Sequence, residues 1–216
     1  MTRRLLVLLA VTLAVTSSVA YAASLNVSSW RLWAGSQTLT KATCTVTGAL
    51  VDTYVDQNAA TTGFGAAATL DMVPSGDTPK QAWVFVKFDL SSCAIPTTGG
   101  ADSATLSLFL STAPTTSFNY DLTRVTSTWA STLTWNQAQA LTYAGSPTTS
   151  IVGGTTAGVR TFTVTSDVDS FIKGGSNFGW RVSDTGAGQN AAKDRAIFAS
   201  TESGTNVPTL TINYEK

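Results

Sequence analysis

The 216-residue sequence contains no histidine. This absence excludes the Ser-His-Asp and Cys-His arrangements of nucleophilic catalysis and every zinc or iron site built on imidazole. It also removes the one side chain whose unperturbed pKa lies close to neutrality. The sequence therefore offers little of the machinery that enzymes use to move protons at neutral pH.

Charged residues are scarce as well. They make up 12% of the sequence, and the 13 Lys and Arg residues balance the 13 Asp and Glu residues. A nucleic-acid-binding protein normally carries a basic surplus that neutralises phosphates, so this balance argues against such a partner. What is abundant is Thr, Ser, Ala and Gly beside 43% hydrophobic residues, a composition that favours strands and turns over helices.

The N-terminus has the pattern of a secretory signal peptide. Arg3 and Arg4 precede an apolar run over 5–15, and Ala20-Tyr21-Ala22 forms a small-x-small cleavage site. The apolar run is too short to cross about 30 Å of hydrocarbon, so a membrane helix is the weaker interpretation. We therefore expect residues 1–22 to be removed and the mature protein to be extracellular, with no membrane segment. Loss of the two arginines leaves a net charge of −2 from the balanced total.

The expected export indicates the state of the two cysteines. In an oxidising compartment Cys44 and Cys93 are expected to form a disulfide rather than a metal pair or a catalytic thiol. The bond closes a loop of about 50 residues and contributes about 4 kcal/mol in the chain-entropy treatment. It also ties the segment 23–49, predicted to be an N-terminal arm or an extra strand, to a domain over 50–216.

Alternating hydrophobicity predicts an all-β fold. In 83–90 the even-numbered residues are all apolar and should face a core, whereas the odd-numbered ones are Trp, Phe, Lys and Asp. Residues 103–110 alternate in the same way. Further strands are predicted at 50–55, 119–125, 159–164, 179–182, 195–199 and 208–214, separated by Gly-rich or Pro-containing turns.

One short helix interrupts this pattern. Ser166 or Asp167 is expected to cap its N-terminus, and Gly174-Gly175 ends it. Many short strands with a single short helix indicate a β-sandwich or a barrel.

Several short motifs occur in an order typical of a known family. These motifs are Asp52-Thr53-Tyr54-Val55, Gly63-Phe64-Gly65, Val86-Lys87-Phe88-Asp89-Leu90-Ser91, Ser103-Ala104-Thr105-Leu106, Arg124-Val125-Thr126, Thr134-Trp135-Asn136, Asn177-Phe178-Gly179, Phe198-Ala199-Ser200 and Pro208-Thr209-Leu210. In this order over 50–216 they resemble the DNRLRE domain, which overlaps with carbohydrate-binding module family ninety-six. The resemblance implies a β-sandwich of jelly-roll type in a secreted protein that binds polysaccharides such as alginate without catalysis. The sequence departs from the family at Ala130 and Ser131, where an acidic residue is common, and at 137–139, where proline is common.

Candidate glycan-binding residues combine aromatic faces with cations. Aromatic rings pack on the C–H surfaces of sugars, and Lys or Arg forms charge-assisted hydrogen bonds with sugar carboxylates. The best row of this kind alternates with the core-facing side of 83–90, and arginines of three other strands extend it. The predicted set is Trp83, Phe85, Lys87, Arg124, Arg181 and Arg195. Structural explanations stay open for both parts of this set. The row is instead buried if its strand is central and covered on both sides, or if the N-terminal arm lies over it. The arginines instead pair with nearby aspartates.

Other aromatic residues have a structural explanation as well as a functional one. Trp129 and Trp135 share a face if extended, and Tyr143 follows them, so they form either an exposed platform or the anchors of a long loop. Trp180 is predicted to be a core residue.

The acidic residues give weak signals. Asp167 and Asp169 form a carboxylate pair of the sort that glycoside hydrolases use, but helix capping explains Asp167 more simply. Asp184-Thr185-Gly186 matches the aspartic protease tripeptide in one copy only. No cofactor is predicted. A structural calcium ion stays undecided, with Asp52 and Asp89 as candidate ligands beside Asp167.

These observations favour a secreted, non-catalytic polysaccharide-binding module, with acidic glycans such as alginate as possible ligands. The alternative is a structural or adhesive cell-surface protein that uses the same sandwich for protein contacts. Expected partners are a polysaccharide and, as a separate chain, a polysaccharide-degrading enzyme or an envelope protein.

Overall fold

A computed structural model describes residues 40–74, 81–184 and 195–216. The predicted signal peptide and residues 23–39 of the expected arm lie outside these ranges. None of the helices within them is long and apolar enough to cross a membrane.

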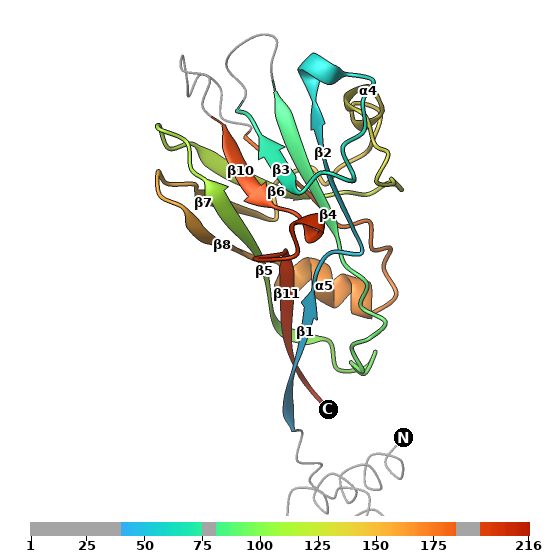
Figure 1. The fold of residues 1–216 in the computed structure, drawn as a ribbon. Coiled ribbons are helices and arrows are strands. Elements are labelled where there is room, and N and C mark those ends of the chain that lie inside the picture. Colours follow the sequence, from blue (N-terminus) through green and yellow to red (C-terminus); the bar gives the residue numbers. More distant parts are fainter. Residues whose placement is uncertain (1–39, 75–80, 185–194) are drawn as a thin grey trace, which may run out of the picture. The chain divides into compact units, whose positions relative to one another are not determined.

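Two antiparallel sheets make up the described part of the chain (Figure 1). The six-stranded sheet has the order β1-β11-β5-β10-β3, and β8 pairs with the other edge of β5. Its strands are β1 (Lys41–Thr47), β3 (Thr69–Met72), β5 (Ala101–Thr112), β8 (Gly158–Thr163), β10 (Ala196–Ala199) and β11 (Thr209–Glu215). The five-stranded sheet has the order β2-β4-β9-β6-β7. Its strands are β2 (Val51–Asp56), β4 (Ala82–Lys87), β6 (Asn119–Arg124), β7 (Thr149–Val152) and β9 (Trp180–Ser183).

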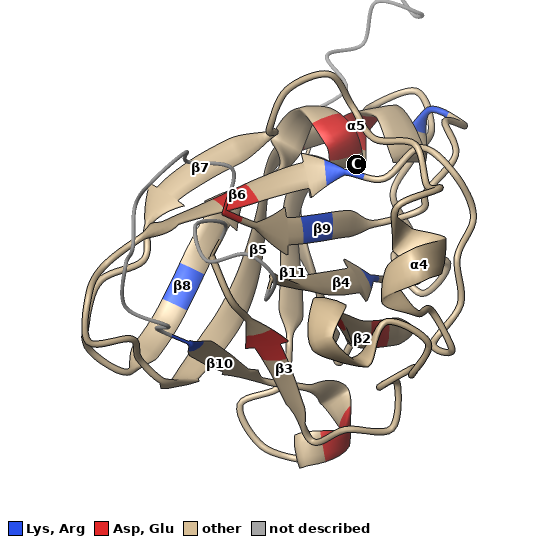
Figure 2. Ribbon diagram, turned by 90° about the horizontal axis from the view of Figure 1, so that it is seen from above, with Lys and Arg blue, Asp and Glu red and all other residues tan. Residues whose placement is uncertain are grey.

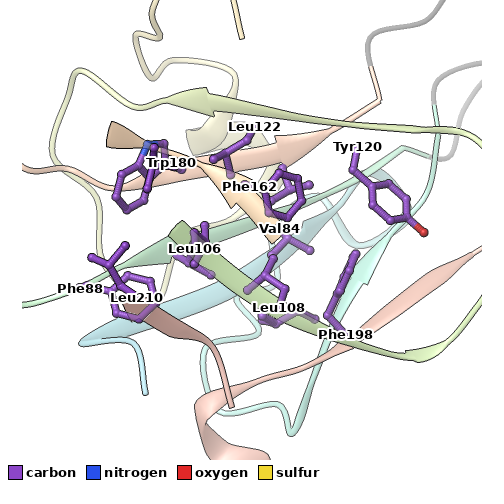
Figure 3. Packing of buried hydrophobic residues seen from close by; sticks show 14 of the residues in the cluster. Val84, Phe88, Leu106, Leu108, Tyr120, Leu122, Phe162, Trp180, Phe198 and Leu210 are labelled. Atoms are coloured by element: carbon purple, nitrogen blue, oxygen red, sulfur yellow. The ribbon is translucent and has the colours of Figure 1, made fainter. Parts of the chain in front are cut away.

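The core lies between the sheets, which confirms the predicted all-β sandwich. Val84 and Phe88, from β4 and the residue after it, contribute to one buried cluster with Leu106 and Leu108 of β5 (Figure 3). The same cluster includes Trp180, which is fully buried as predicted. Burial of side chains from both sheets holds the layers together because each loses apolar surface to the other.

The helices are short. They are η1 (Gln57–Ala59), α4 (Trp135–Ala138), α5 (Thr165–Ile172) and η2 (Thr201–Ser203). The predicted helix is α5, but its expected cap is wrong. Val164 is the N-cap and makes no side-chain capping bond. Asp167 instead lies inside the first turn and is buried.

Three strands were not predicted from periodicity. β3 and β7 have four residues each, too few to show a clear alternation. β1 lies in the segment 23–49, where an arm or an extra strand is expected, and pairs with β11 along its whole length. Its inward positions are Cys44 and Val46 among threonines, and this is a weak hydrophobic signal.

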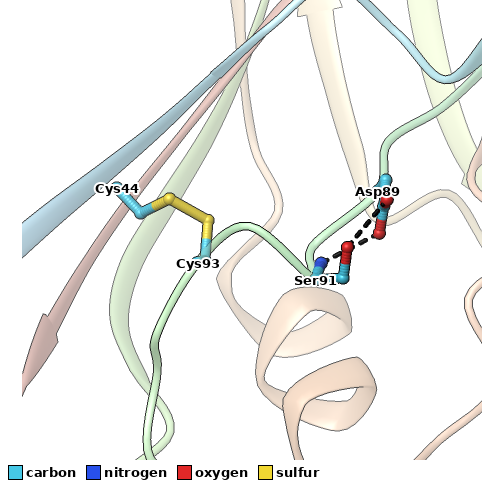
Figure 4. Close-up of a disulfide and its surroundings, with 4 residues drawn as sticks. All are labelled: Cys44, Asp89, Ser91 and Cys93. Atoms are coloured by element: carbon cyan, nitrogen blue, oxygen red, sulfur yellow. Dashed lines mark hydrogen bonds between the residues drawn. A yellow bond between two sulfur atoms is a disulfide. The ribbon is translucent and has the colours of Figure 1, made fainter.

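The disulfide between Cys44 and Cys93 is present, as predicted (Figure 4). It joins β1 to the loop that follows β4, and the two Cα atoms are 5.7 Å apart. The nearby Asp89 carboxylate accepts hydrogen bonds from the Ser91 backbone N–H at 2.9 Å and from its hydroxyl at 2.8 Å. These bonds lower the pKa of Asp89.

Candidate functional site

The outer face of the five-stranded sheet is covered by the loop 126–143. A second buried cluster forms there, in which Phe85 of β4 packs against Trp129 with ring centroids 5.5 Å apart. Phe85 is fully buried as a result. Its expected place on an exposed binding row is therefore wrong. β4 lies between β2 and β9, so the predicted alternative of a central strand buried on both sides describes Phe85, and the loop 126–143 supplies the cover on the outer side.

The tryptophans of the loop act as its anchors. Trp129 and Trp135 are 7% and 8% exposed, so neither forms an open platform. The Trp129 indole N–H donates to the carbonyl of Phe178 at 2.6 Å. Thr134 starts α4 with a capping box, in which its hydroxyl accepts from the Gln137 backbone N–H and the Gln137 side chain accepts from the Thr134 N–H.

At one end of the covered row, a guanidinium lies between two aromatic rings. The Arg181 Cζ atom is 4.6 Å from the Trp83 ring centroid and 4.2 Å from that of Tyr143. Phe85 is the strand partner of Arg181, and this register places both on the outer face of the sheet. All three members of this aromatic–guanidinium stack, Trp83, Tyr143 and Arg181, are half-buried.

The Arg181 guanidinium packs between the two rings although its Nε atom is not hydrogen-bonded within the described residues. Burial lowers the pKa of Arg181, while Tyr143 and the Asp121 carboxylate favour its charged form. Burial also raises the pKa of Tyr143, whose hydroxyl donates to the Ala138 carbonyl at 2.6 Å. Because an arginine stays protonated in proteins, the stack presents a fixed positive charge with aromatic walls.

Lys87 lies at the other end of the row. Its Nζ is 5.3 Å from the centroid of the Trp129 ring, and the side chain is half-buried. The loop therefore covers Phe85 fully and also packs Trp135 against Trp83, with ring centroids 4.5 Å apart. Trp83, Lys87 and Arg181 remain half-buried.

Arg124 and Arg195 do not join this surface. The Arg124 Nε lies 3.6 Å from an oxygen of Asp167, and the Arg195 guanidinium lies 3.1 Å from the Asp71 carboxylate. Arg195 directly precedes β10, a strand of the six-stranded sheet. Burial raises the pKa of Asp71, and Arg195 counters that effect. Figure 2 shows the Lys and Arg positions dispersed over several strands. For these two arginines, the predicted alternative of pairing with aspartates describes the structure.

A groove of about 390 Å³ runs beside the loop 126–143 and was not predicted. It is lined by hydroxyl and small side chains: Thr61, Gly63, Gly65, Ala66, Ser131, Thr132 and Thr134. A Cβ atom at Gly65 would lie 2.4 Å from a backbone oxygen of the facing segment, so glycine permits this close approach. The Gly63-Phe64-Gly65 motif is the sequence signal that points to it.

The acidic candidates are distributed over separate structural roles. The Asp52 carboxylate accepts from the Thr201 N–H at 2.9 Å and from its hydroxyl at 2.6 Å, which fastens η2 to β2. Burial raises the pKa of Asp52 to about 6, and the nearby Glu202 carboxylate adds to the effect. Asp89 binds Ser91 as described above. The described residues contain no group of three or more His, Cys, Asp or Glu side chains that could hold a metal ion.

Asp167 has a buried structural role. It accepts from the Trp180 indole N–H at 2.8 Å and from the Thr148 hydroxyl at 2.6 Å. Asp169, by contrast, forms an exposed ion pair with Lys173 at 2.8 Å. Asp184 is buried after β9, and the rest of its tripeptide lies outside the described residues. Asp167 and Asp169 thus have different partners and different exposure.

Comparison with known proteins gives one family. The model of carbohydrate-binding module family 96 matches residues 43–214, which take in both sheets and the loop 126–143. No curated protein matches the chain.

Proposed function

The chain belongs to carbohydrate-binding module family 96, and we propose from this that it is a secreted, non-catalytic module that binds an acidic polysaccharide such as alginate. Families of this kind are generally non-catalytic. The disulfide and the signal-peptide pattern support export, because disulfides persist in oxidising compartments.

The aromatic–guanidinium stack carries the proposal. Trp83 and Tyr143 supply apolar ring surface for the C–H faces of a sugar, and Arg181 supplies the donors that favour a carboxylate. Lys87, at the other end of the row, supplies a second positive charge for another residue of the same polymer. The two cations, on the neighbouring strands β4 and β9, suit a ligand that repeats its negative charge.

Binding without catalysis accords with the chemistry of the remaining residues. The sequence has no histidine. The buried Asp52 and Asp167 carboxylates are engaged by hydrogen bonds that hold the fold together.

Affinity electrophoresis in gels that contain alginate, polygalacturonate or a neutral glucan tests the proposal. We expect the wild type to be retarded by an acidic glycan. We expect Arg181→Ala to lose at least about tenfold in affinity, equivalent to about 1.4 kcal/mol. Arg195→Ala is the matched control, since it removes an arginine next to a strand of the other sheet, and should bind as the wild type does.

Two results would contradict the proposal. One is the absence of retardation on every glycan. The other is co-purification with envelope proteins in the absence of any glycan binding, and this would favour the structural or adhesive alternative. Thermal unfolding of each variant checks that altered binding does not follow from loss of the fold.

A further inference from the structure

The outer face of the six-stranded sheet carries polar, uncharged side chains in a regular array. The core takes the alternate residues of β1, β11, β5 and β8, among them Leu210, Ile212, Leu106 and Phe162. The residues between these point outward. At three successive levels of the sheet those outward positions hold only threonine, serine and one asparagine, and we name this surface the hydroxyl face.

The strand register aligns the array in rows. One row crosses all four strands as Thr45, Thr211, Thr105 and Thr163. Neighbouring strands lie about 4.8 Å apart, and the next outward row follows about 6.7 Å along each strand. The result is a grid of hydroxyl and methyl groups.

The next row also crosses four strands and consists of Thr47, Thr209, Ser107 and Thr161. Thr209 donates to the Val207 carbonyl at 3.2 Å. No side-chain hydrogen bond joins the other hydroxyls of this row or those of the Thr45 row to any residue in the described ranges. Within the described part of the chain, their donors and acceptors are therefore left for a ligand.

The third row behaves differently, because its polar groups satisfy one another. The Thr43 hydroxyl donates to the Asn213 side-chain oxygen at 2.7 Å, and the Asn213 amide donates to the Ser103 hydroxyl at 2.9 Å. This end of the face has less capacity left for a ligand than the two rows beside it.

A groove of about 180 Å³ lies at the opposite end of the hydroxyl face. Phe109 and Val159 face each other across β5 and β8, and Val159 is 60% exposed. Asn206, which also lines the groove, has a φ of 54°, a left-handed conformation that few residues other than glycine adopt. The groove thus adds an aromatic side chain and an amide to the adjoining hydroxyls, a combination that suits the C–H surface and the hydroxyls of a sugar ring.

The charge of this surface indicates what binds there. None of the three rows contains Lys, Arg, Asp or Glu, so an ionic polymer would lose hydration without gaining an ion pair. A neutral sugar polymer instead exchanges its hydroxyl hydrogen bonds with water for hydrogen bonds with the array. We propose that the hydroxyl face and its groove form a second binding surface, which takes an uncharged polysaccharide lying flat on the sheet. This proposal shares with the proposed function only the ligand class of the family, and it concerns a different site.

Pull-down on insoluble polysaccharides tests this surface. The probes are microcrystalline cellulose, insoluble chitin and an insoluble β-1,3-glucan, each incubated with purified mature protein. Thr211→Lys places a bulky charge at the centre of the array, and Phe109→Ala removes the ring from the groove. We expect each to lower binding of the retained glycan at least fivefold. Thr128→Lys, an exposed position on the loop over the other sheet, is the matched control and should have no effect.

The two sites are separated by a parallel measurement on alginate. Thr211→Lys should keep its retardation by alginate, whereas Arg181→Ala should keep its binding to the neutral polymer. Failure of the wild type to bind any neutral polymer would overturn the second surface, while retardation by alginate would leave the proposed function standing. Full neutral-glycan binding by Thr211→Lys would also overturn it. A third result would overturn the second surface as well: Thr211→Lys changes self-association in sedimentation velocity but leaves glycan binding unchanged. The hydroxyl face would then bind a second copy of the chain.

Discussion

Removing the disulfide should cost the protein a large share of its stability. The bond between Cys44 and Cys93 spans 49 positions of sequence, and the chain-entropy treatment gives about 4 kcal/mol for a loop of that length. Replacing both residues by alanine adds about 1 kcal/mol for lost packing, because both sulfurs lie against the core. With a urea dependence of about 2 kcal/mol per M, a total loss of about 5 kcal/mol should lower the unfolding midpoint by about 2.5 M.

Urea unfolding and hydrogen exchange measure this effect together. Within the described residues β1 pairs with β11 alone, so its amides should lose more protection than those of β4. Ser91→Ala is a local control, since it breaks the adjacent hydrogen bond to Asp89 and leaves the disulfide intact. The control should leave the midpoint unchanged within error. A loss below about 1 kcal/mol in the double variant, or unchanged protection of β1, would refute the reasoning.

Three further predictions concern buried contacts. Burial raises the pKa of Asp52 from 3.8 to about 6, so its contribution to stability is present below pH 4 and is lost as the pH rises through 6. Asp52→Asn should remove this loss of stability with rising pH, which is on the order of 2 kcal/mol once solvent screening is allowed for. Tm measured between pH 4 and 7 checks this, and parallel profiles for variant and wild type would contradict it. Gly65→Ala should destabilise the protein by about 1–3 kcal/mol in urea unfolding, because the added Cβ has no room. Gly145→Ala is the control and should be neutral, since no atom lies within 4 Å of its added Cβ. Equal effects of the two substitutions would contradict the close approach at Gly65. Asp167→Ala should cost about 2–4 kcal/mol in the same assay, because it leaves the indole N–H of Trp180 buried without its acceptor, and a loss under 1 kcal/mol would show that this bond matters little.

Local patterns predicted what depends on local geometry. The alternation in 83–90 correctly placed Val84, Val86 and Phe88 in the core, because successive side chains of a strand point to opposite faces. The cysteine pair could be predicted because two cysteines allow only one intramolecular pairing.

The candidate site depends on contacts between segments that are distant in the sequence. The hydrophobic periodicity of a single segment does not predict such contacts. Alternation assigns Phe85 to the outer face, but it cannot show that Trp129 covers that face. Arg181 was a candidate from its strand, yet the ring of Tyr143 reaches it from a loop. Asp167 has the sequence position of a cap, and its partner Trp180 comes from β9.

The hydroxyl face follows a similar rule. Thr-x-Thr alternation is visible within β1 and within β11, but the rows exist only through the pairing register of four strands. Register results from turns and from packing across the sandwich, and single strands do not encode it.

The most direct test of the central claim is the dissociation constant of the mature protein for alginate oligosaccharides, measured by calorimetry for the wild type and for Arg181→Ala. We expect saturable binding by the wild type and at least about tenfold weaker binding by the variant. Equal affinities in two folded proteins, or no heat of binding from the wild type, would contradict it.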